Sequence, residues 1–218
     1  MLGYMAQHGF SFSESIFCAV NPTPGTGIVC NPTATTFSKT AGLMNIYNSA
    51  KASAAKADIR SNNNQWIVPI CLRLTATQTN TAASVFRLVG VLDGSDRYTS
   101  GGTNLSITST SVDTRTGYSS RTPKADIDFG NLVLVTSDTK HVFNTIVAQN
   151  ILNAGETIEV WFGEGPNTSQ TNLVKVVPPV WIGRESSLAI HEVVTGQTDD
   201  AAFEVEFWFA EIQHKKVL

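Results

Sequence analysis

The four histidines of the chain are its first candidates for chemistry, because imidazole binds metal ions and exchanges protons near neutral pH. A metal site on adjacent strand positions needs two histidines one residue apart and a following carboxylate, and the chain has no such spacing. The nearest approach is His191 followed by Glu192, but neighbouring strand residues point to opposite faces. The sequence therefore predicts no metal site and makes His191 a polar residue on a strand face. The histidines are His8, His141, His191 and His214.

Glu204 and Glu206 form the best-spaced pair of carboxylates. In a strand they share one face and lie about 7 Å apart, a separation that glycosidases use. They alternate with a row of phenylalanines, however, and acidic residues opposite an apolar row normally face solvent. We therefore expect a solvent-facing pair rather than a catalytic one.

The other motifs of catalysis and cofactor binding are absent or incomplete. Asp126 with Asp128, and Asp199 with Asp200, offer oxygen atoms to calcium but lack the dense ligand spacing of a dedicated site. No Gly-x-Ser-x-Gly motif marks a nucleophile, and the Gly-x-Gly at 25–27 lacks the third glycine of a dinucleotide loop. The sequence thus predicts a protein with no enzymatic activity and no cofactor.

Aromatic side chains are the remaining binding candidates, because exposed rings stack on sugars, although large aromatics in strands more often belong to a core or a subunit interface. The loop at 97–104, Arg-Tyr-Thr-Ser-Gly-Gly-Thr-Asn, is the most distinctive segment outside the expected core. Its glycines permit close backbone approach, and Arg97 and Tyr98 are placed to anchor a neighbouring subunit or a ligand. The aromatic candidates are Trp161, Trp181, Trp208, Tyr98 and Tyr118.

Strands must position these residues. From residue 65 onward, short apolar stretches are separated by turn residues such as Asp93-Gly94-Ser95-Asp96. Successive strands without intervening helices exclude a parallel α/β fold. They indicate an all-β antiparallel sandwich, and a jelly roll is the arrangement that uses eight such strands. The expected strands cover 66–76, 84–93, 104–109, 125–136, 141–150, 156–163, 173–177, 187–194 and 202–212.

Residues 1–60 differ from the rest, and we expect them to form an extended N-terminal arm beside a sandwich domain at 61–218. Repeated prolines between residues 22 and 32 break the chain. The Ala- and Lys-rich stretch at 41–57 predicts one short helix. We expect the arm to attach the protein to another chain and not to build the core. The apolar face of this helix, available for packing against another chain, would carry Leu43, Ile46, Tyr47 and Ala50.

Composition narrows the classes of protein further. The chain has 218 residues, enough for one sizeable core. Charged residues make up 15%, below the roughly 25% of average soluble domains, which suits extracellular particles and assemblies. The net charge of -3 and the lack of a basic run argue against a nucleic-acid partner. No apolar stretch approaches the ~18 residues that span a membrane, and residues 1–9 lack the features of a secretory signal.

The three cysteines are odd in number and form no Cys-x-x-Cys pair, so they imply no disulfide framework. Cys71 lies in an apolar stretch and is expected to be a buried thiol. Cys18 and Cys30 could pair only if the loop between them folds back.

Three features together resemble the single jelly-roll auxiliary capsid proteins of tailed bacteriophages, the cement or decoration class. They are the Asn-Pro-Thr of the N-terminal segment, the Asp-Gly-Ser-Asp-Arg-Tyr-Thr-Ser-Gly-Gly-Thr loop at 93–103, and the Pro-Pro-Val-Trp-Ile-Gly stretch at 178–183 ahead of an aromatic final strand. The resemblance covers roughly the whole chain and rests on pattern rather than on a catalytic signature.

The resemblance implies a virion protein, made in the host cytoplasm, that binds the major capsid protein on the outside of the head. Members of this class commonly form trimers, and the apolar strands with a weakly charged surface also favour a homotrimer. A trimeric receptor-binding tail protein whose jelly roll binds carbohydrate is the alternative, which an aromatic-lined groove at the outer loops would favour. A small self-assembling capsid subunit is a third possibility. We assign the interface to Phe10, Phe12, Leu43, Ile46, Tyr47, Arg97, Tyr98 and Trp181.

Overall fold

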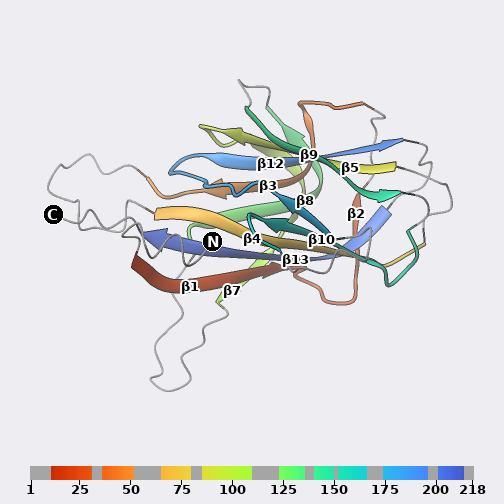
Figure 1. Ribbon diagram of the computed structural model, residues 1–218, viewed down its shortest axis with the longest axis horizontal. Helices are drawn as coiled ribbons and strands as arrows, with labels where there is room; N and C mark the ends of the chain where they lie inside the picture. The colour runs from red at the N-terminus through yellow and green to blue at the C-terminus, as the bar shows by residue number, and fades with distance from the viewer. Residues whose placement is uncertain are drawn as a thin grey trace, which may run out of the picture.

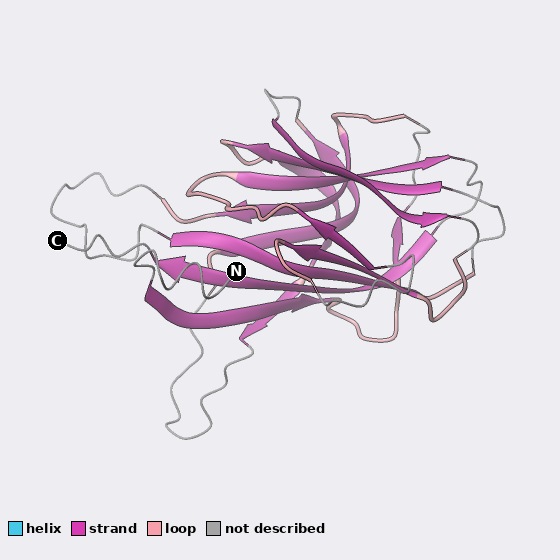
Figure 2. Ribbon diagram, viewed as in Figure 1, coloured by secondary structure: helices cyan, strands magenta, loops and turns pink. Residues whose placement is uncertain are grey.

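A computed structural model of the chain describes residues 11–30, 36–51, 65–79, 85–109, 123–135, 140–149, 152–165, 174–195 and 201–213. Every regular element within these residues is a strand, and the strands form two sheets packed as a β-sandwich (Figure 2). The all-β prediction is therefore confirmed. The strands are β1 (Ser11–Val20), β2 (Ile28–Cys30), β3 (Ala41–Asn48), β4 (Gln65–Ala76), β5 (Val85–Asp93), β6 (Tyr98–Asn104), β7 (Ser106–Ser109), β8 (Ala125–Leu134), β9 (Lys140–Gln149), β10 (Thr157–Phe162), β11 (Val174–Val177), β12 (Ser187–Thr195) and β13 (Ala201–Gln213).

The seven-stranded sheet has the order β11-β10-β4-β13-β1-β7, with β2 added beside β13. The six-stranded sheet has the order β6-β8-β3-β12-β5-β9. The sheets lie face to face (Figure 1). Nearly all pairs are antiparallel, but β10 and β11 run parallel, so the prediction of a wholly antiparallel sandwich is wrong at that edge.

The inner face of β13 supplies the centre of the core. Phe203, Val205, Phe207 and Phe209 are each at most 1% exposed, while Glu204 and Glu206 lie on the other face, as their alternation predicts. Within this row, the rings of Phe207 and Phe209 stack with their centroids 5.6 Å apart.

A β-bulge in β4 exchanges the two faces of that strand. Trp208 pairs with Cys71 but Phe209 pairs with Pro69, which leaves Ile70 as the extra residue. After the bulge, the even-numbered residues Leu72, Leu74 and Ala76 point into the core. Before the bulge, the odd-numbered Ile67 points into the core instead. Trp66 is consequently turned outward, into a cluster with Trp181 on the outside of the sheet.

The predicted helix at 41–57 is wrong where the structure describes it. Residues Ala41–Asn48 form strand β3, between β12 and β8 in the six-stranded sheet. Leu43 and Ile46 are 2% and 0% exposed, because both sides of this stretch are covered and tertiary burial outweighs a weak local helix preference. Residues 52–57 lie outside the described residues.

The prediction that residues 1–60 stand apart from the sandwich is also wrong for the described part of that segment. β1 lies between β13 and β7, and β2 pairs with β13. The loop between them is tied down by Asn21, whose Nδ2 donates to Thr26 O at 2.8 Å and whose Oδ1 accepts from Val205 N at 2.9 Å. Pro22 and Pro24 therefore shape the connection between β1 and β2, since they lie outside the regular ladders.

All nine strands predicted beyond residue 65 are present within a few residues of their expected bounds. β6, which was expected to be a loop, is an additional strand. All three cysteines are free thiols. Cys18 lies opposite Trp208 and Cys30 lies opposite Ala201, so the two are held apart along the length of β13. No described helix is long and apolar enough to cross a membrane.

Candidate binding site at one end of the sandwich

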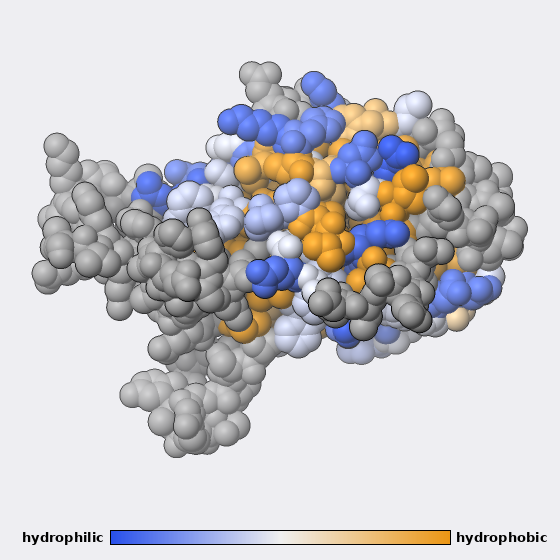
Figure 3. Space-filling view, viewed as in Figure 1, coloured by the Kyte–Doolittle hydropathy of each residue, from blue (hydrophilic) through white to orange (hydrophobic). Residues whose placement is uncertain are grey.

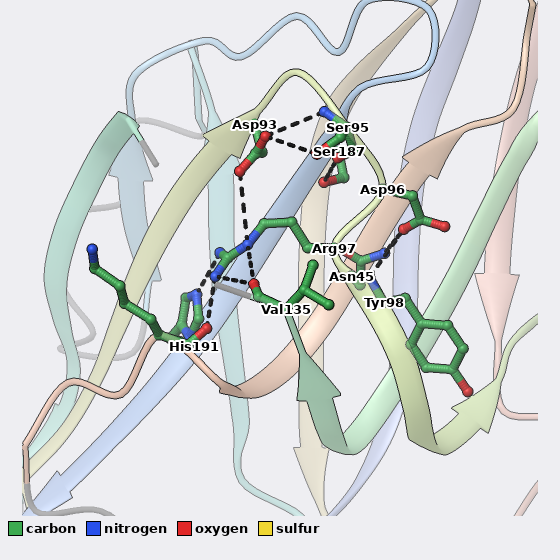
Figure 4. A network of polar contacts seen from close by, with 10 residues as sticks. Asn45, Asp93, Ser95, Asp96, Arg97, Tyr98, Val135, Ser187 and His191 are labelled. Carbon is green, nitrogen blue, oxygen red and sulfur yellow. Dashed lines mark hydrogen bonds and ion pairs between the residues drawn. The ribbon is translucent and has the colours of Figure 1, made fainter. Parts of the chain in front are cut away.

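The turn between β5 and β6 is held by its own acidic residue. Asp93 Oδ1 accepts from Ser95 N at 3.2 Å and from Ser95 Oγ at 3.1 Å. Ser187 Oγ donates to Ser95 O at 2.7 Å and ties the turn to β12 (Figure 4). The turn that leads into the predicted recognition loop at 97–104 is thus fixed to the six-stranded sheet.

Arg97 lies inside the molecule and is not a surface anchor. Its side chain is 0% exposed, and its Nη2 donates to Lys39 O at 2.6 Å and to Val135 O at 3.2 Å. Its Nε lies 3.8 Å from Asp93 Oδ2. Burial lowers the pKa of the guanidinium, and Asp93 opposes that shift. The prediction that Arg97 contacts another chain or a ligand is therefore wrong, because its donors are directed to groups of its own fold.

His191 completes this buried network, in agreement with its predicted place on a strand. Its Nδ1 lies 2.7 Å from Ala41 O and its Nε2 lies 3.2 Å from Arg97 Nη1. Both contacts fit a neutral ring that donates from Nδ1 and accepts at Nε2. Burial, reinforced by the charge of Arg97, lowers the pKa of His191 to about 4. The His191 ring is therefore neutral near pH 7, and its role is structural.

A pocket of about 280 Å³ opens beside this network. Two tryptophans form its aromatic wall, Trp66 from β4 and Trp181 from the segment before β12, with ring centroids 6.2 Å apart and planes at 71°. Gly183 allows this approach, since a Cβ there would lie 3.3 Å from the ring of Trp66. The pocket is lined by Trp66, Leu92, Asp93, Gly94, Lys140, Trp181, Gly183 and Ser186.

The floor beneath the tryptophans is rigid. Asn48 is 0% exposed, and its Nδ2 donates to Gln65 O at 2.9 Å and to Ile182 O at 3.1 Å. The backbones of Ile67 and Ile182 also exchange hydrogen bonds, at 2.9 and 3.0 Å. The residues next to Trp66 and Trp181 are therefore joined, and the wall is preorganised.

The other predicted interface residues fall into three groups. Leu43 and Ile46 are core residues, so their assignment to an interface is wrong. Tyr47, Tyr98 and Trp181 are partly exposed, and the Tyr98 hydroxyl donates to Gly101 O at 3.0 Å. Phe10 lies outside the described residues, and Phe12 is placed only as a backbone position of β1.

Glu204 and Glu206 hold structural contacts on the outer face of β13. Glu206 forms an ion pair with Arg73 at 3.0 Å, and Arg73 also pairs with Glu159 at 3.0 Å. Glu204 accepts a hydrogen bond from Gly25 N. Among the described residues, no three acidic, histidine or cysteine side chains gather closely enough to hold a metal ion.

A second, larger hollow of about 370 Å³ lies between the loop after β1 and β6. Small side chains and backbone line it, including Thr23, Gly27, Gly102 and Thr103. It offers no aromatic ring and no charged group, so the tryptophan pocket is the better candidate for recognition.

Sequence reasoning found Trp181 but missed Trp66 and Lys140 as partners in one site. Trp66 begins a strand, which suggests a core residue, and only the bulge at Ile70 turns it outward. The proline at position 69 was the available signal, because proline inside a strand marks an edge or a bulge.

Comparison of the chain with protein-family models, with curated proteins and with solved structures gives no match. Function is therefore inferred from the residues and their arrangement.

Proposed function

We propose that the protein is a structural component of a bacteriophage particle, a jelly-roll cement or decoration protein that binds the major capsid protein on the outside of the head as a homotrimer. It acts by binding and carries out no reaction. Its place is the virion surface.

The observation that carries this proposal is the pairing of eight strands. In the larger sheet, β1-β13-β4-β10 are consecutive neighbours, and in the smaller sheet β3-β12-β5-β9 are consecutive neighbours. Numbered one to eight along the chain, these strands pair as 1-8-3-6 and 2-7-4-5, and this order supports a jelly roll. Jelly rolls are frequent in viral capsid and lectin domains. Analogy with such domains supports a capsid role for this fold, and the sequence resemblance supports it further.

The outer surface supplies contact area for such a role. Trp66, Ile70 and Trp181 are partly exposed around the apolar cluster on the outside of the seven-stranded sheet. Figure 3 shows further apolar side chains gathered between hydrophilic ones on the face in view. Surface patches of this kind mark protein contacts when they are contiguous.

The test uses particles of the source phage that lack this protein. Purified protein is added back, the heads are pelleted, and electron microscopy locates any added density. Saturable binding at regular positions on the outside of the head, with greater resistance of the heads to heat, is the expected result. Absence of the protein from the heads of wild-type particles would refute the proposal.

A receptor-binding protein that recognises carbohydrate is the second candidate. The pocket with two tryptophans favours it, because a concave site with aromatic walls and a few polar groups suits a sugar ring. In this case the protein is found on the tail of the particle and binds the surface of the host cell.

A further inference from the structure

We propose that the pocket between Trp66, Trp181 and Lys140 binds a single sugar ring that carries a carboxylate. This inference specifies the ligand of the second candidate function and does not depend on decoration of the head. It follows from the size of the pocket, its aromatic wall and the balance of its charges.

Size limits the ligand to about one ring. The pocket volume of about 280 Å³ lies just below the roughly 300–1,000 Å³ typical of ligand pockets. The two indoles stand at 71° to each other, so they form a corner. A pyranose can place its C–H bonds against an indole face there while its hydroxyl groups stay hydrated.

Charge selects the kind of ring. The pocket has one acidic and one basic lining residue, Asp93 and Lys140. Asp93 is 8% exposed and already accepts two hydrogen bonds from Ser95, and Arg97 lies 3.8 Å away. The negative charge of Asp93 is therefore balanced by Arg97 inside the fold, and its carboxylate is unavailable to a ligand.

Lys140, in contrast, is exposed at the start of β9, opposite Leu92. Its ammonium group forms no ion pair with any residue that the structure describes. A carboxylate on the ligand would receive charge-assisted hydrogen bonds from it. Ser186 donates its hydroxyl to Arg184 O at 3.1 Å, which leaves the Ser186 oxygen able to accept from a sugar hydroxyl.

The test compares methyl β-glucuronide with methyl β-glucoside. The two differ only at C6, which is a carboxylate in the glucuronide and a hydroxymethyl group in the glucoside. Ligand-observed NMR and tryptophan fluorescence follow binding to the full chain. We expect the glucuronide to bind on the order of fivefold more tightly, the range of a partly hydrated ion pair, and this preference to shrink as salt is raised.

Lys140→Gln should abolish the preference, so that the two sugars bind this variant with equal affinity. Trp181→Ala should weaken the binding of both sugars. Lys175→Gln on β11 and Trp161→Ala on β10 are the matched controls, because these residues lie on other strands and do not line the pocket, and they should change neither affinity.

Equal binding of the two sugars, or an unchanged preference in Lys140→Gln, would overturn the acidic ligand but leave a carbohydrate receptor standing. Failure of both sugars to bind at tens of millimolar would overturn the site and the second candidate together. Neither result bears on binding to the phage head, which the particle assay measures.

Discussion

Arg97 and His191 show how a charged and a titratable residue become structural at the scale of single side chains. Three backbone or side-chain partners of Arg97 come from segments far apart in the sequence, at Lys39, Val135 and His191. A cation that is satisfied in this way fixes the turn at 93–96 against two neighbouring segments. The unusual sequence around Arg97 therefore reflects the contacts that hold this segment inside the fold, and not a role on the surface.

Arg97→Met should destabilise the fold by about 3–5 kcal/mol, because it leaves Asp93 buried without its cation and removes the donors to two carbonyl groups. Urea unfolding measures the change. Arg87→Met is the matched control, since the Arg87 side chain donates to Asn144 Oδ1 at 3.2 Å in an exposed contact on the protein surface. A loss below about 1 kcal/mol in Arg97→Met, typical of a surface substitution, would contradict this account.

Acid should destabilise the protein through His191. Its pKa falls from 6.5 to about 4 on folding, so the stabilisation is complete above pH 6.5 and is lost as pH drops toward 4. His191→Gln should flatten the stability profile in this window by up to about 3 kcal/mol. His141→Gln, at an exposed position, is the control and should keep the slope of the unmodified chain.

Glu192 has the opposite dependence. It lies on the inner face of β12, and burial raises its pKa from 4.5 to about 8. The proton is held more tightly in the folded chain, so stability is greatest below pH 4.5 and declines as pH rises toward 8. Glu192→Gln should remove this decline and stabilise the protein at pH 7 by about 1–3 kcal/mol. A thermal melt series from pH 5 to 8 tests the prediction, and an unchanged slope would refute it.

At the scale of elements, the strands beyond residue 65 were predictable because alternation and turn residues mark them. β3 was not, because Leu43, Met44, Asn45 and Ile46 are all buried and leave no two-residue period. β6 escaped detection because its residues are polar and its glycines adopt φ of +88° and +66°. In the site, the sequence singled out Trp181, but only the folded sheets bring Trp66 and Lys140 beside it. Arg97 was singled out as a surface anchor, and its burial could not be read from the sequence.

Removal of residues 1–50 should prevent folding, because it deletes β1, β2 and β3. β1 and β3 lie inside their sheets, and their loss would strip β13 and β12 of the neighbouring strand on one side, leaving β4 and β5 on the other. Removal of residues 1–10 alone keeps every described strand and is the matched control. Circular dichroism and proteolysis of the two truncated chains provide the measurement. A folded, cooperative 51–218 fragment would show that the first three strands are dispensable.

At the scale of the whole molecule, the apolar cluster outside the seven-stranded sheet predicts self-association. We expect light scattering at micromolar concentration to give the mass of three chains of 23.5 kDa. Ile70→Glu should dissociate the trimer, since it places a charge against the apolar cluster of Val68, Ala210 and Ile212 on the outside of the sheet. Glu204→Gln, elsewhere on the outer face, is the control. A mass of 23.5 kDa for the unmodified protein would exclude the trimer.

The neighbouring positions of β1, β13 and β4 in one sheet also constrain how the protein is made (Figure 1). Arg73 on β4 must wait for Glu206, 133 residues later, before its ion pair can form. While the ribosome synthesises this interval, β4 and β1 have open edges that can pair with other nascent chains. The sheet can therefore be completed only after β13 has been synthesised. We expect slow folding, because the paired strands are distant in sequence. We also expect chains that stop before β13 to aggregate or to be degraded.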